Sequence, residues 1–433
     1  MKIKKNLVNQ VLMSIVTAAT VFGFTACSED WLESEDYNAV PVKTAAPVKQ
    51  NGPIGRTVLV YMAGKNNLTS ETRNYLNEDL EEIKEGSRRL NDSDCLLVFV
   101  RRYLPDNNLE TPWLARISNG EVTDSVSVAD MGITKSDARA CDPEVMKQVM
   151  GYAYSHYPAT RDYGLVLWSH STGWMIENEM PSTRGYGLDN GNYVNGAGKW
   201  INVPTMKNIL ATLPHLKFIM ADCCHFMCLE SLYELRSIAD YVIGSPAEIP
   251  AEGAPYKEVV PAMFEAETFY TSIVDKYHAS RNGCLPLSVV KMSEMEHVAE
   301  ATAQVMQSVK VNLGGQYADL TGMIHYGHLD NRVQFYAENN FFFDAGDFIS
   351  RNASKTDYQQ WKQALDKAVI LKRIGYTWQT QKVWRIFYDD FKMTDEKFHG
   401  VSMFIPQDPA LGKYARCNED IKQMEWYKAT ETR

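Results

Sequence analysis

Residues 163–174 read YGLVLWSHSTGW, an apolar run that ends in polar residues and a histidine. A short run rich in Leu, Val and aromatic residues predicts a buried β-strand. Similar runs lie along the chain at 57–62, 95–100 and 216–221, and helical patterns separate them. Because continuous apolar strands that alternate with helices are covered on both faces, they predict an α/β fold with a mostly parallel sheet flanked by helices.

The helices expected between these strands have recognisable boundaries. Asp142 followed by Pro143 is typical of an N-cap and a first helical turn. Ser70 is expected to cap a helix that ends before Gly86. These helices cover residues 70–85, 142 onward, 203–213 and 229–238. Further strands are expected at 241–243, 285–291 and 400–405 and further helices at 292–310 and 357–371, so the second half extends the sheet and adds a helical layer.

The composition limits the class of protein. The 433 residues carry 44 Lys and Arg against 54 Asp and Glu, which gives a net charge of −10 and a pI near 5.5. This acidity excludes nucleic acid as the main partner, since phosphate binding needs an excess of basic residues. Charged residues at 23% and hydrophobic residues at 45% exclude bulk disorder and allow roughly two to three domains. The eight cysteines are too few for a disulfide scaffold, yet three lie within residues 223–228.

The N-terminal 27 residues are not expected to belong to the fold. Lys2, Lys4 and Lys5 form a basic region, and the apolar stretch at 11–24 is too short for a comfortable membrane span. The stretch ends in FTAC, which resembles a bacterial lipobox, so residues 1–27 are predicted to be a lipoprotein signal peptide with Cys27 as the lipidated residue. A plain signal peptide, cleaved nearby, is the alternative.

Residues 28–55 are predicted to be a solvated tether, since they hold too few apolar residues to fold. The stretch 28–36 is strongly acidic, and 40–53 is rich in Pro, Ala and Lys. Acidic residues directly after a lipobox cysteine resemble the surface-export signal of some Gram-negative lipoproteins. We therefore expect an outer-membrane lipoprotein exposed at the cell surface, attached to the membrane only by lipid; a tether that faces the periplasm is the alternative.

Two strand ends carry residues capable of nucleophilic catalysis. His170 follows the strand at 163–168, and Cys223 and Cys224 follow the strand at 216–221. Parallel strands bring their carboxyl ends to one edge of a sheet, where such residues can meet. A free thiol is mostly protonated at neutral pH, and a neighbouring imidazole allows it to react as a thiolate. In caspases the histidine also precedes the cysteine by roughly 50 residues, although their Q-A-C-x-G pattern is absent here.

Three segments resemble motifs of the clostripain-like cysteine peptidases. Residues 58–68 resemble the opening strand and loop of that family, and 165–174 resemble its histidine motif. Asp222-Cys223-Cys224 resembles its nucleophile motif, in which a Glu follows the cysteine by six residues; Glu230 selects Cys224 rather than Cys223. Weaker matches lie at 250–256, 344–348 and 400–404, so the resemblance covers residues 56–405.

The resemblance implies a caspase-like peptidase core at 56–260, followed by a C-terminal sheet extension and helical layer at 261–433. It implies a cysteine endopeptidase that cleaves peptides or proteins after Arg or Lys. His170 is then the general base and Cys224 the nucleophile. No cofactor is expected apart from calcium, whose use varies in the family; the chain has no EF-hand motif, which leaves other calcium sites open.

The same resemblance assigns substrate contacts. Asp222 would line the pocket for the basic side chain, which a carboxylate binds best through a charge-assisted pair. Glu252 matches a second acidic position of that pocket. Backbone N–H groups near Ser171 and Cys224 would form the oxyanion hole. Arg184, in a loop rich in Gly and Asn, matches the region of self-cleavage in the family, and an ordinary basic loop residue is its alternative.

The chain departs from the family pattern beside both catalytic candidates. Ser171 stands where the family usually has Gly. The serine either alters the oxyanion loop or tolerates the same backbone conformation. Cys223 and His225 are also unusual beside the nucleophile. A second hypothesis is therefore a surface lipoprotein that binds glycans or peptides on a degraded peptidase scaffold, with the 9 Trp and 23 Tyr as a source of binding surface.

Other interpretations of the single residues stay open. His170 alone is more typical of a hydrogen-bonded structural histidine, and Cys224 alone of an inert buried thiol. Asp222 could cap the helix that follows its strand. Zinc binding and a disulfide between Cys224 and Cys228 are disfavoured by ligand spacing and by helical geometry. A serine hydrolase that uses Ser169 or Ser171 is disfavoured because G-x-S-x-G is missing.

Overall fold

The computed structural model describes residues 52–69, 74–104, 110–175, 185–192, 198–326, 341–375, 393–411 and 414–431. The predicted signal peptide, Cys27, the tether as far as residue 51 and the predicted processing residue Arg184 lie outside these ranges. None of the helices within them is both long and apolar enough to cross a membrane.

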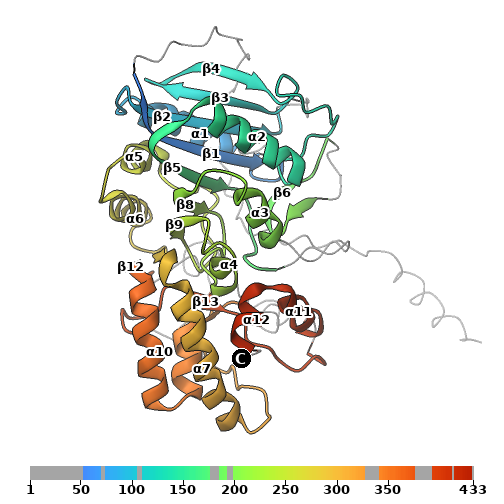
Figure 1. Cartoon of the computed structure of the whole chain (residues 1–433), viewed down its shortest axis with the longest axis vertical. Helices are drawn as coiled ribbons and strands as arrows, with labels where there is room; N and C mark the ends of the chain where they lie inside the picture. Colours follow the sequence, from blue (N-terminus) through green and yellow to red (C-terminus); the bar gives the residue numbers. More distant parts are fainter. Residues whose placement is uncertain are drawn as a thin grey trace, which may run out of the picture.

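A nine-stranded sheet runs through the molecule and confirms the predicted α/β fold (Figure 1). The strand order is β12-β10-β9-β8-β5-β1-β2-β3-β4. The five central strands pair in parallel, and the pairs toward both edges are antiparallel. The strands are β1 (Ile54–Gly64), β2 (Asp94–Arg102), β3 (Trp113–Ser118), β4 (Glu121–Ser127), β5 (Ala159–Trp168), β8 (Leu216–Asp222), β9 (Ala239–Gly244), β10 (Leu287–Lys291) and β12 (Val369–Arg373).

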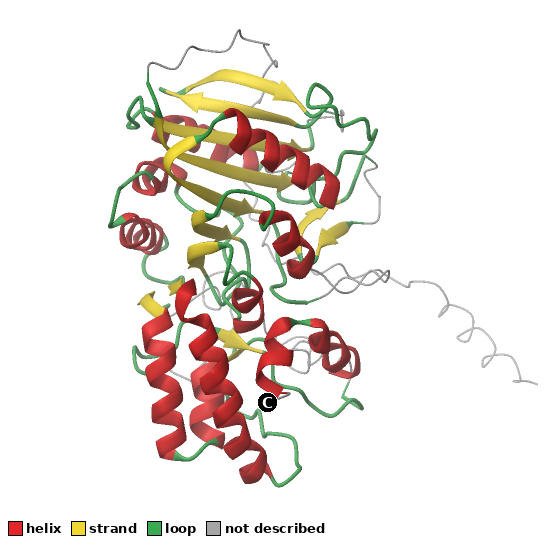
Figure 2. Ribbon diagram, in the orientation of Figure 1, coloured by secondary structure: helices red, strands yellow, loops and turns green. Residues whose placement is uncertain are grey.

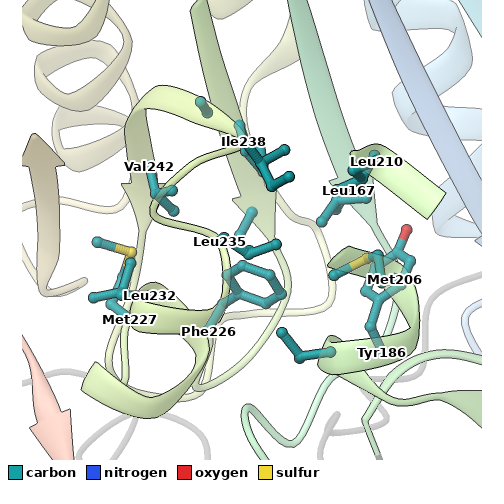
Figure 3. Packing of buried hydrophobic residues seen from close by; sticks show 14 of the residues in the cluster. Leu167, Tyr186, Met206, Leu210, Phe226, Met227, Leu232, Leu235, Ile238 and Val242 are labelled. Carbon is teal, nitrogen blue, oxygen red and sulfur yellow. The ribbon is translucent and has the colours of Figure 1, made fainter. Parts of the chain in front are cut away.

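Alternate residues of the central strands enter two hydrophobic clusters, one on each face of the sheet. Leu59 of β1 packs in the first cluster, under α2 (Pro143–His156), α3 (Val203–Leu210) and α4 (Leu229–Glu234). Val58 of the same strand packs in the second, under α1 (Tyr75–Ser87), α5 (Tyr256–Met263) and α6 (Phe269–Ser280). Figure 3 shows Leu167, Met206 and Leu232 in the first cluster. Each buried apolar side chain stabilises the fold by about 1.5–3 kcal/mol.

The second half lengthens the sheet with β10 and β12 and adds a layer of helices (Figure 2). The sequence predicts β10 and the helical layer, but the predicted helix at 357–371 ends at Ala368, and β12 follows it directly. The strand predicted at 400–405 is reduced to residues 402–403, which pair with 343–344 outside the main sheet. The long helices are α7 (Met295–Leu313) and α10 (Lys355–Ala368). The shorter helices are α9 (Ala345–Asn352), α11 (Tyr414–Asp420), α12 (Glu425–Glu431), η2 (Met292–Glu294) and η3 (Ile421–Gln423). Two small sheets consist of two strands each: β6 (Tyr186–Asp189) pairs with β7 (Lys199–Ile201), and β11 (Phe343–Asp344) pairs with β13 (Ser402–Met403).

Local signals differ in how well they mark the element ends. Asp142 caps α2 as predicted, and its side chain accepts from the N–H groups of Glu144 and Val145. Helix α1 begins later than predicted, at Tyr75 with Asn74 as its N-cap, and the predicted cap Ser70 lies outside the described residues. Helix α4 is shorter than its pattern predicts and ends at Glu234. These differences matter at the site, because α4 follows the cysteine segment.

Candidate active site

The carboxyl ends of β5 and β8 bring the histidine and cysteine segments together. Trp168 and Asp222 are register partners in these neighbouring parallel strands. His170 and Cys224 each lie two residues beyond that pair. Both line one open cavity of about 270 Å³. The other residues that line it are Leu68, Trp168, Ser169, Asp222, Ile249, Pro250, Ala251 and Gly253.

The His170 ring is held by an amide from the loop after β1. The ring is 8% exposed, and its Nε2 lies 2.7 Å from Oδ1 of Asn67. An amide oxygen only accepts, so Nε2 donates this hydrogen bond and the lone pair of the neutral ring is on Nδ1. The sequence motif at 58–68 contains Asn67, but the sequence alone assigned it no role. In the neutral ring, Nδ1 is then the atom that is able to accept a proton.

The Cys224 thiol lies in a different environment from that of Cys223. Cys224 packs in the second hydrophobic cluster and Cys223 in the first, on the opposite face of the sheet. The Cys224 side chain is 5% exposed, and its Sγ accepts from the N–H of Ile249 at 3.4 Å. Only Cys224 of the two lines the cavity.

The surroundings of Cys224 oppose thiolate formation. Burial, and then the negative charge of Glu248, raise the pKa of the Cys224 thiol far above its ordinary range. The Ile249 N–H acts in the opposite direction but does not compensate. The resting thiol is therefore protonated, and it needs a base at the moment of reaction.

The Asp222 carboxylate is buried and extensively hydrogen-bonded. Oδ2 accepts from the Ala254 N–H at 3.0 Å and from the Tyr256 hydroxyl at 2.8 Å. Oδ1 accepts from the Tyr277 hydroxyl at 2.8 Å. Burial raises the pKa of Asp222 in spite of these hydrogen bonds and of the nearby Arg281 guanidinium. Helix α4 begins only at Leu229 with Cys228 as its N-cap, so the alternative that Asp222 caps this helix is wrong.

The loop after Ile249 places Gly253 against Asp222 but directs Glu252 elsewhere. Gly253 has φ of +53°, and a Cβ at this residue would lie 2.6 Å from Oδ2 of Asp222. Glycine is therefore required for the close approach of this loop. Ala251 and Gly253 line the cavity, whereas half-buried Glu252 is not among the lining residues. Of the two predicted acidic residues, the structure brings only Asp222 to the cavity.

Ser171 connects the histidine and cysteine segments. Its hydroxyl accepts from the Gly173 N–H at 3.1 Å, and its side chain also hydrogen-bonds to Cys223. Gly173 has φ of +60°, and a Cβ there would lie 2.7 Å from the carbonyl oxygen of His225. The serine at 171 is thus accommodated by side-chain contacts, and the glycine that the backbone requires stands at 173.

His225 lies beside the nucleophile candidate in a strained conformation. Its φ is +56°, which few non-glycine residues adopt. The ring stacks on Phe342 at 4.3 Å between centroids. Its Nδ1 lies 3.2 Å from the carbonyl oxygen of Pro246, and its Nε2 lies 3.9 Å from Oε1 of Glu248. His225 is therefore fixed by a ring and a loop, and it does not line the cavity.

The C-terminal half contacts both segments of the site. The Phe404 N–H donates to Oε1 of Glu230 at 2.7 Å, and the Phe404 ring packs on that of Trp174 at 4.9 Å between centroids. The Ser402 N–H donates to the Met227 carbonyl at 3.0 Å. Residues 402–404 therefore hold the segment after His170 and the segment after Cys224 in one arrangement.

None of the cysteines of the described residues forms a disulfide, and Cys228 is buried in an aromatic cluster with Trp174 and Phe404. Within the described ranges, no three His, Cys, Asp or Glu residues are placed to hold a metal ion. The disulfide between Cys224 and Cys228 is not formed, and the two residues precede helix α4.

A mostly parallel α/β sheet with a thiol and an imidazole at its carboxyl edge is an arrangement typical of cysteine peptidases. The model of the Clostripain family matches residues 60–432, and the chain belongs to this family. It is accordingly a peptidase, a hydrolase that acts on peptides or proteins. No curated protein matches the chain.

Two solved structures resemble the whole folded part of the chain. One is a secreted C11 cysteine protease from Bacteroides thetaiotaomicron in complex with an irreversible peptide inhibitor, with 28% identity and a TM-score of 0.66 over 87% of this chain and 99% of that one. The other is an inactive zymogen C11 protease from Parabacteroides distasonis, with 26% identity and a TM-score of 0.67 over 88% and 99% of the two chains. The described fold is thus that of C11 proteases.

Proposed function

We propose that the chain is a cysteine endopeptidase that cleaves after Arg or Lys, with Cys224 as the nucleophile and His170 as the general base. The observation that supports this proposal is the single cavity lined by His170, Cys224 and Asp222. It combines a base, a nucleophile and a carboxylate for a basic side chain. No other role considered for these residues accounts for all three in one cavity.

The reaction follows from these groups. Nδ1 of His170 takes the thiol proton, and the thiolate of Cys224 attacks the carbonyl carbon of the peptide. Backbone N–H groups near Ser171 and Cys224 stabilise the oxyanion of the tetrahedral intermediate. The intermediate collapses to a thioester and the amine leaves with the proton from His170. Water then gives its proton to His170 and attacks the thioester, which releases the acid and restores the thiol.

An arginyl acylating probe tests the nucleophile. Cys224→Ala is expected to abolish covalent labelling, and Cys223→Ala is the matched control that leaves labelling in place because that thiol packs on the other face of the sheet. Labelling that persists in Cys224→Ala would contradict the assignment. Absence of labelling in a folded, processed wild-type protein would favour the second hypothesis, a binding lipoprotein on the same scaffold.

Asp222 is proposed to select the basic side chain at the cleaved bond. Asp222→Asn is expected to lower kcat/KM for arginyl substrates at least about a hundredfold, because a charge-assisted hydrogen bond becomes a neutral one in a buried site. Glu252→Gln is expected to have a smaller effect, since Glu252 does not line the cavity. Cleavage after Arg that is unaffected in Asp222→Asn would contradict the proposal.

Three further proposals concern maturation, location and cofactors. We propose self-cleavage at Arg184, lipidation of Cys27 with export to the cell surface, and catalysis without a cofactor. Arg184→Ala should then leave the precursor uncut, and Cys27→Ala should remove incorporation of a labelled fatty acid. Activity should persist in a calcium chelator. A wild-type chain that stays uncut would contradict self-cleavage, and one that incorporates no labelled fatty acid would contradict lipidation. Activity that is lost in the chelator and restored by calcium would contradict catalysis without a cofactor.

A further inference from the structure

A second buried carboxylate, Asp79 of helix α1, lies behind the wall of the cavity near Asp222. Its side chain is 3% exposed, and its Oδ2 accepts from the indole N–H of Trp168 at 2.6 Å. Trp168 is both a lining residue of the cavity and the register partner of Asp222. Asp79 is not a lining residue, but it is hydrogen-bonded to one. The sequence alone gave it no role, because it lies inside an ordinary amphipathic helix.

Gly253 shows how close the two carboxylates are. A Cβ on this residue would lie 2.6 Å from Oδ2 of Asp222 and 3.4 Å from Oδ2 of Asp79. The two oxygens therefore lie within about 6 Å of each other, a separation at which one carboxylate disfavours ionisation of the other. Gly253 also lines the cavity, so both acids approach it at this point.

The hydrogen bonds of Asp222 limit what it can offer a cation alone. Oδ2 already accepts two hydrogen bonds, from Ala254 and Tyr256, and Oδ1 accepts one, from Tyr277. A carboxylate has roughly four acceptor positions, so Asp222 retains one. A guanidinium bound bidentately needs an acceptor on each oxygen. A strong preference for a cationic side chain thus calls for further negative charge beside Asp222.

The charges around Asp79 favour its protonated form when the cavity is empty. Burial, and then the charge of Asp222, raise the pKa of Asp79 well above its ordinary value. The Trp168 hydrogen bond acts in the opposite direction without reversing the shift. The titratable or charged groups around the two acids are Glu78 and Glu82 on α1, Tyr256 on α5, Tyr277 on α6 and Arg281 after α6. Only Arg281 among them is a cation.

We propose that Asp79 is the second acid of the pocket for the basic side chain, and that it releases its proton when a cationic side chain binds. A cation in the cavity favours the ionised form of both acids, so that the filled pocket holds two carboxylates where the empty pocket holds one. This proposal rests on the proposed preference for Arg or Lys. It makes Asp79 a specificity residue that acts through its charge, since Asp79 does not itself line the cavity.

Titration calorimetry of the full chain with two product peptides tests the proposal, one ending in arginine and one in citrulline, its neutral isostere. Buffers of different ionisation enthalpy give the number of protons released on binding. The arginine peptide should bind at least about tenfold more tightly than the citrulline peptide and release a proton. The citrulline peptide should release none.

Asp79→Asn keeps an acceptor for Trp168 and removes the ionisable group. It should abolish the proton release and lower the preference for arginine about tenfold, while Glu81→Gln, which neutralises an exposed acid on the same helix, should behave as the wild type. Unchanged proton release and preference in Asp79→Asn would overturn the assignment and leave the role of Asp222 standing. A wild type that does not distinguish the two peptides would overturn the proposed specificity, and Asp79 with it.

Melting temperatures show whether Asp79→Asn folds. If it does not, the proton count of the wild type decides: release should fall toward the alkaline end of the pH range over which the protein is folded, because Asp79 there loses its proton before the peptide binds. A release that is zero or constant over this range would overturn the proposal.

Discussion

The two halves of the molecule each hold a buried histidine with an oxygen partner, and the partners differ in charge. In the first half, His170 donates to the neutral amide of Asn67 and lines the cavity. In the second, Nδ1 of His399 lies 2.6 Å from Oδ1 of Asp344 and the Tyr358 hydroxyl lies 3.1 Å from its Nε2. The amide places no charge beside the first ring, whereas the second ring lies against a buried carboxylate.

The surroundings of Asp344 show that the second pair is structural. Its side chain also accepts from the N–H groups of Asp347 and His399, and from the Tyr326 hydroxyl. Burial works against ionisation of Asp344, but the charge and hydrogen bond of His399 hold its pKa below the ordinary value. Asp344 also caps helix α9. The comparison teaches that a buried imidazole is suited to proton transfer or to a structural hydrogen-bond network according to the charge of its partner and its access to a cavity.

The largest expected effect concerns His170, the histidine of the first half. His170→Ala should lower kcat/KM about 10²–10⁴-fold, the usual contribution of a general base, and should leave the melting temperature nearly unchanged. His399→Ala should instead lower the melting temperature, while the protein that remains folded retains its cleavage rate. Steady-state kinetics and thermal unfolding of both variants measure this. A rate loss in His399→Ala as large as that in His170→Ala would contradict the division of roles.

The next effect concerns the buried pair of Asp344 and His399. Asp344→Asn should lower the free energy of unfolding by about 3–5 kcal/mol, because it removes one partner of a buried charged pair. The sign of the pH dependence follows from the lowered pKa of Asp344: its contribution is present above the unfolded value and is lost as the pH falls through the lower folded value. Denaturant unfolding between pH 2 and 7 measures both. A wild type and an Asp344→Asn protein with parallel profiles below about pH 4 would contradict this.

Glu230, which accepts a hydrogen bond from Phe404 of the second half, gives a pH dependence of stability with the opposite sign. It is fully buried, Oε1 accepts from Phe404, and no described residue donates to Oε2. Burial raises the pKa of Glu230 to about 7. The folded protein therefore binds a proton that the unfolded chain has lost, and stability should fall by up to about 3 kcal/mol as the pH rises from about 4.5 to 7.

Glu230→Gln keeps an acceptor for Phe404 and should remove this slope, which denaturant unfolding over the same pH range measures. The exposed residue Glu81 provides the control, since Glu81→Gln should keep the slope. The same slope of stability against pH in the wild type, Glu230→Gln and Glu81→Gln would contradict the raised pKa of Glu230 as its cause.

The smallest expected effect concerns Asn67, the hydrogen-bond partner of His170. Asn67→Asp gives His170 the kind of partner that His399 has. The carboxylate should favour the protonated ring, move the acidic limb of the kcat/KM profile up by about one pH unit and lower activity at neutral pH about tenfold. Asn67→Ala, which removes the hydrogen bond without adding charge, should not move the limb upward. An identical shift in both variants would show that charge is not its cause.

The sequence predicts what local patterns encode. The buried strands and the Asp142 cap are read from consecutive residues, and the meeting of His170 with Cys224 follows once the strands are parallel. The β3–β4 hairpin was not predicted, although Asn119-Gly120, both with positive φ, is a strong turn signal. That signal was available in the sequence.

Other features depend on contacts between distant residues and have no local signal. Asp79 belongs to no sequence motif, yet it lies near Asp222, and both acids lie close to Gly253. Asp344 and His399 lie 55 residues apart in the sequence and meet near the antiparallel pairing of β11 with β13. A helical or strand period reports which face a residue occupies, but it does not report which residue of another element faces it.

The contacts of residues 402–404 have a consequence for folding during synthesis. His170 and Cys224 leave the ribosome long before Phe404, so Trp174 and Glu230, which follow them in the chain, lack their contacts with Phe404 until that residue has been made. The arrangement of the two segments at the edge of the sheet therefore depends on residues that are synthesised well after both of them.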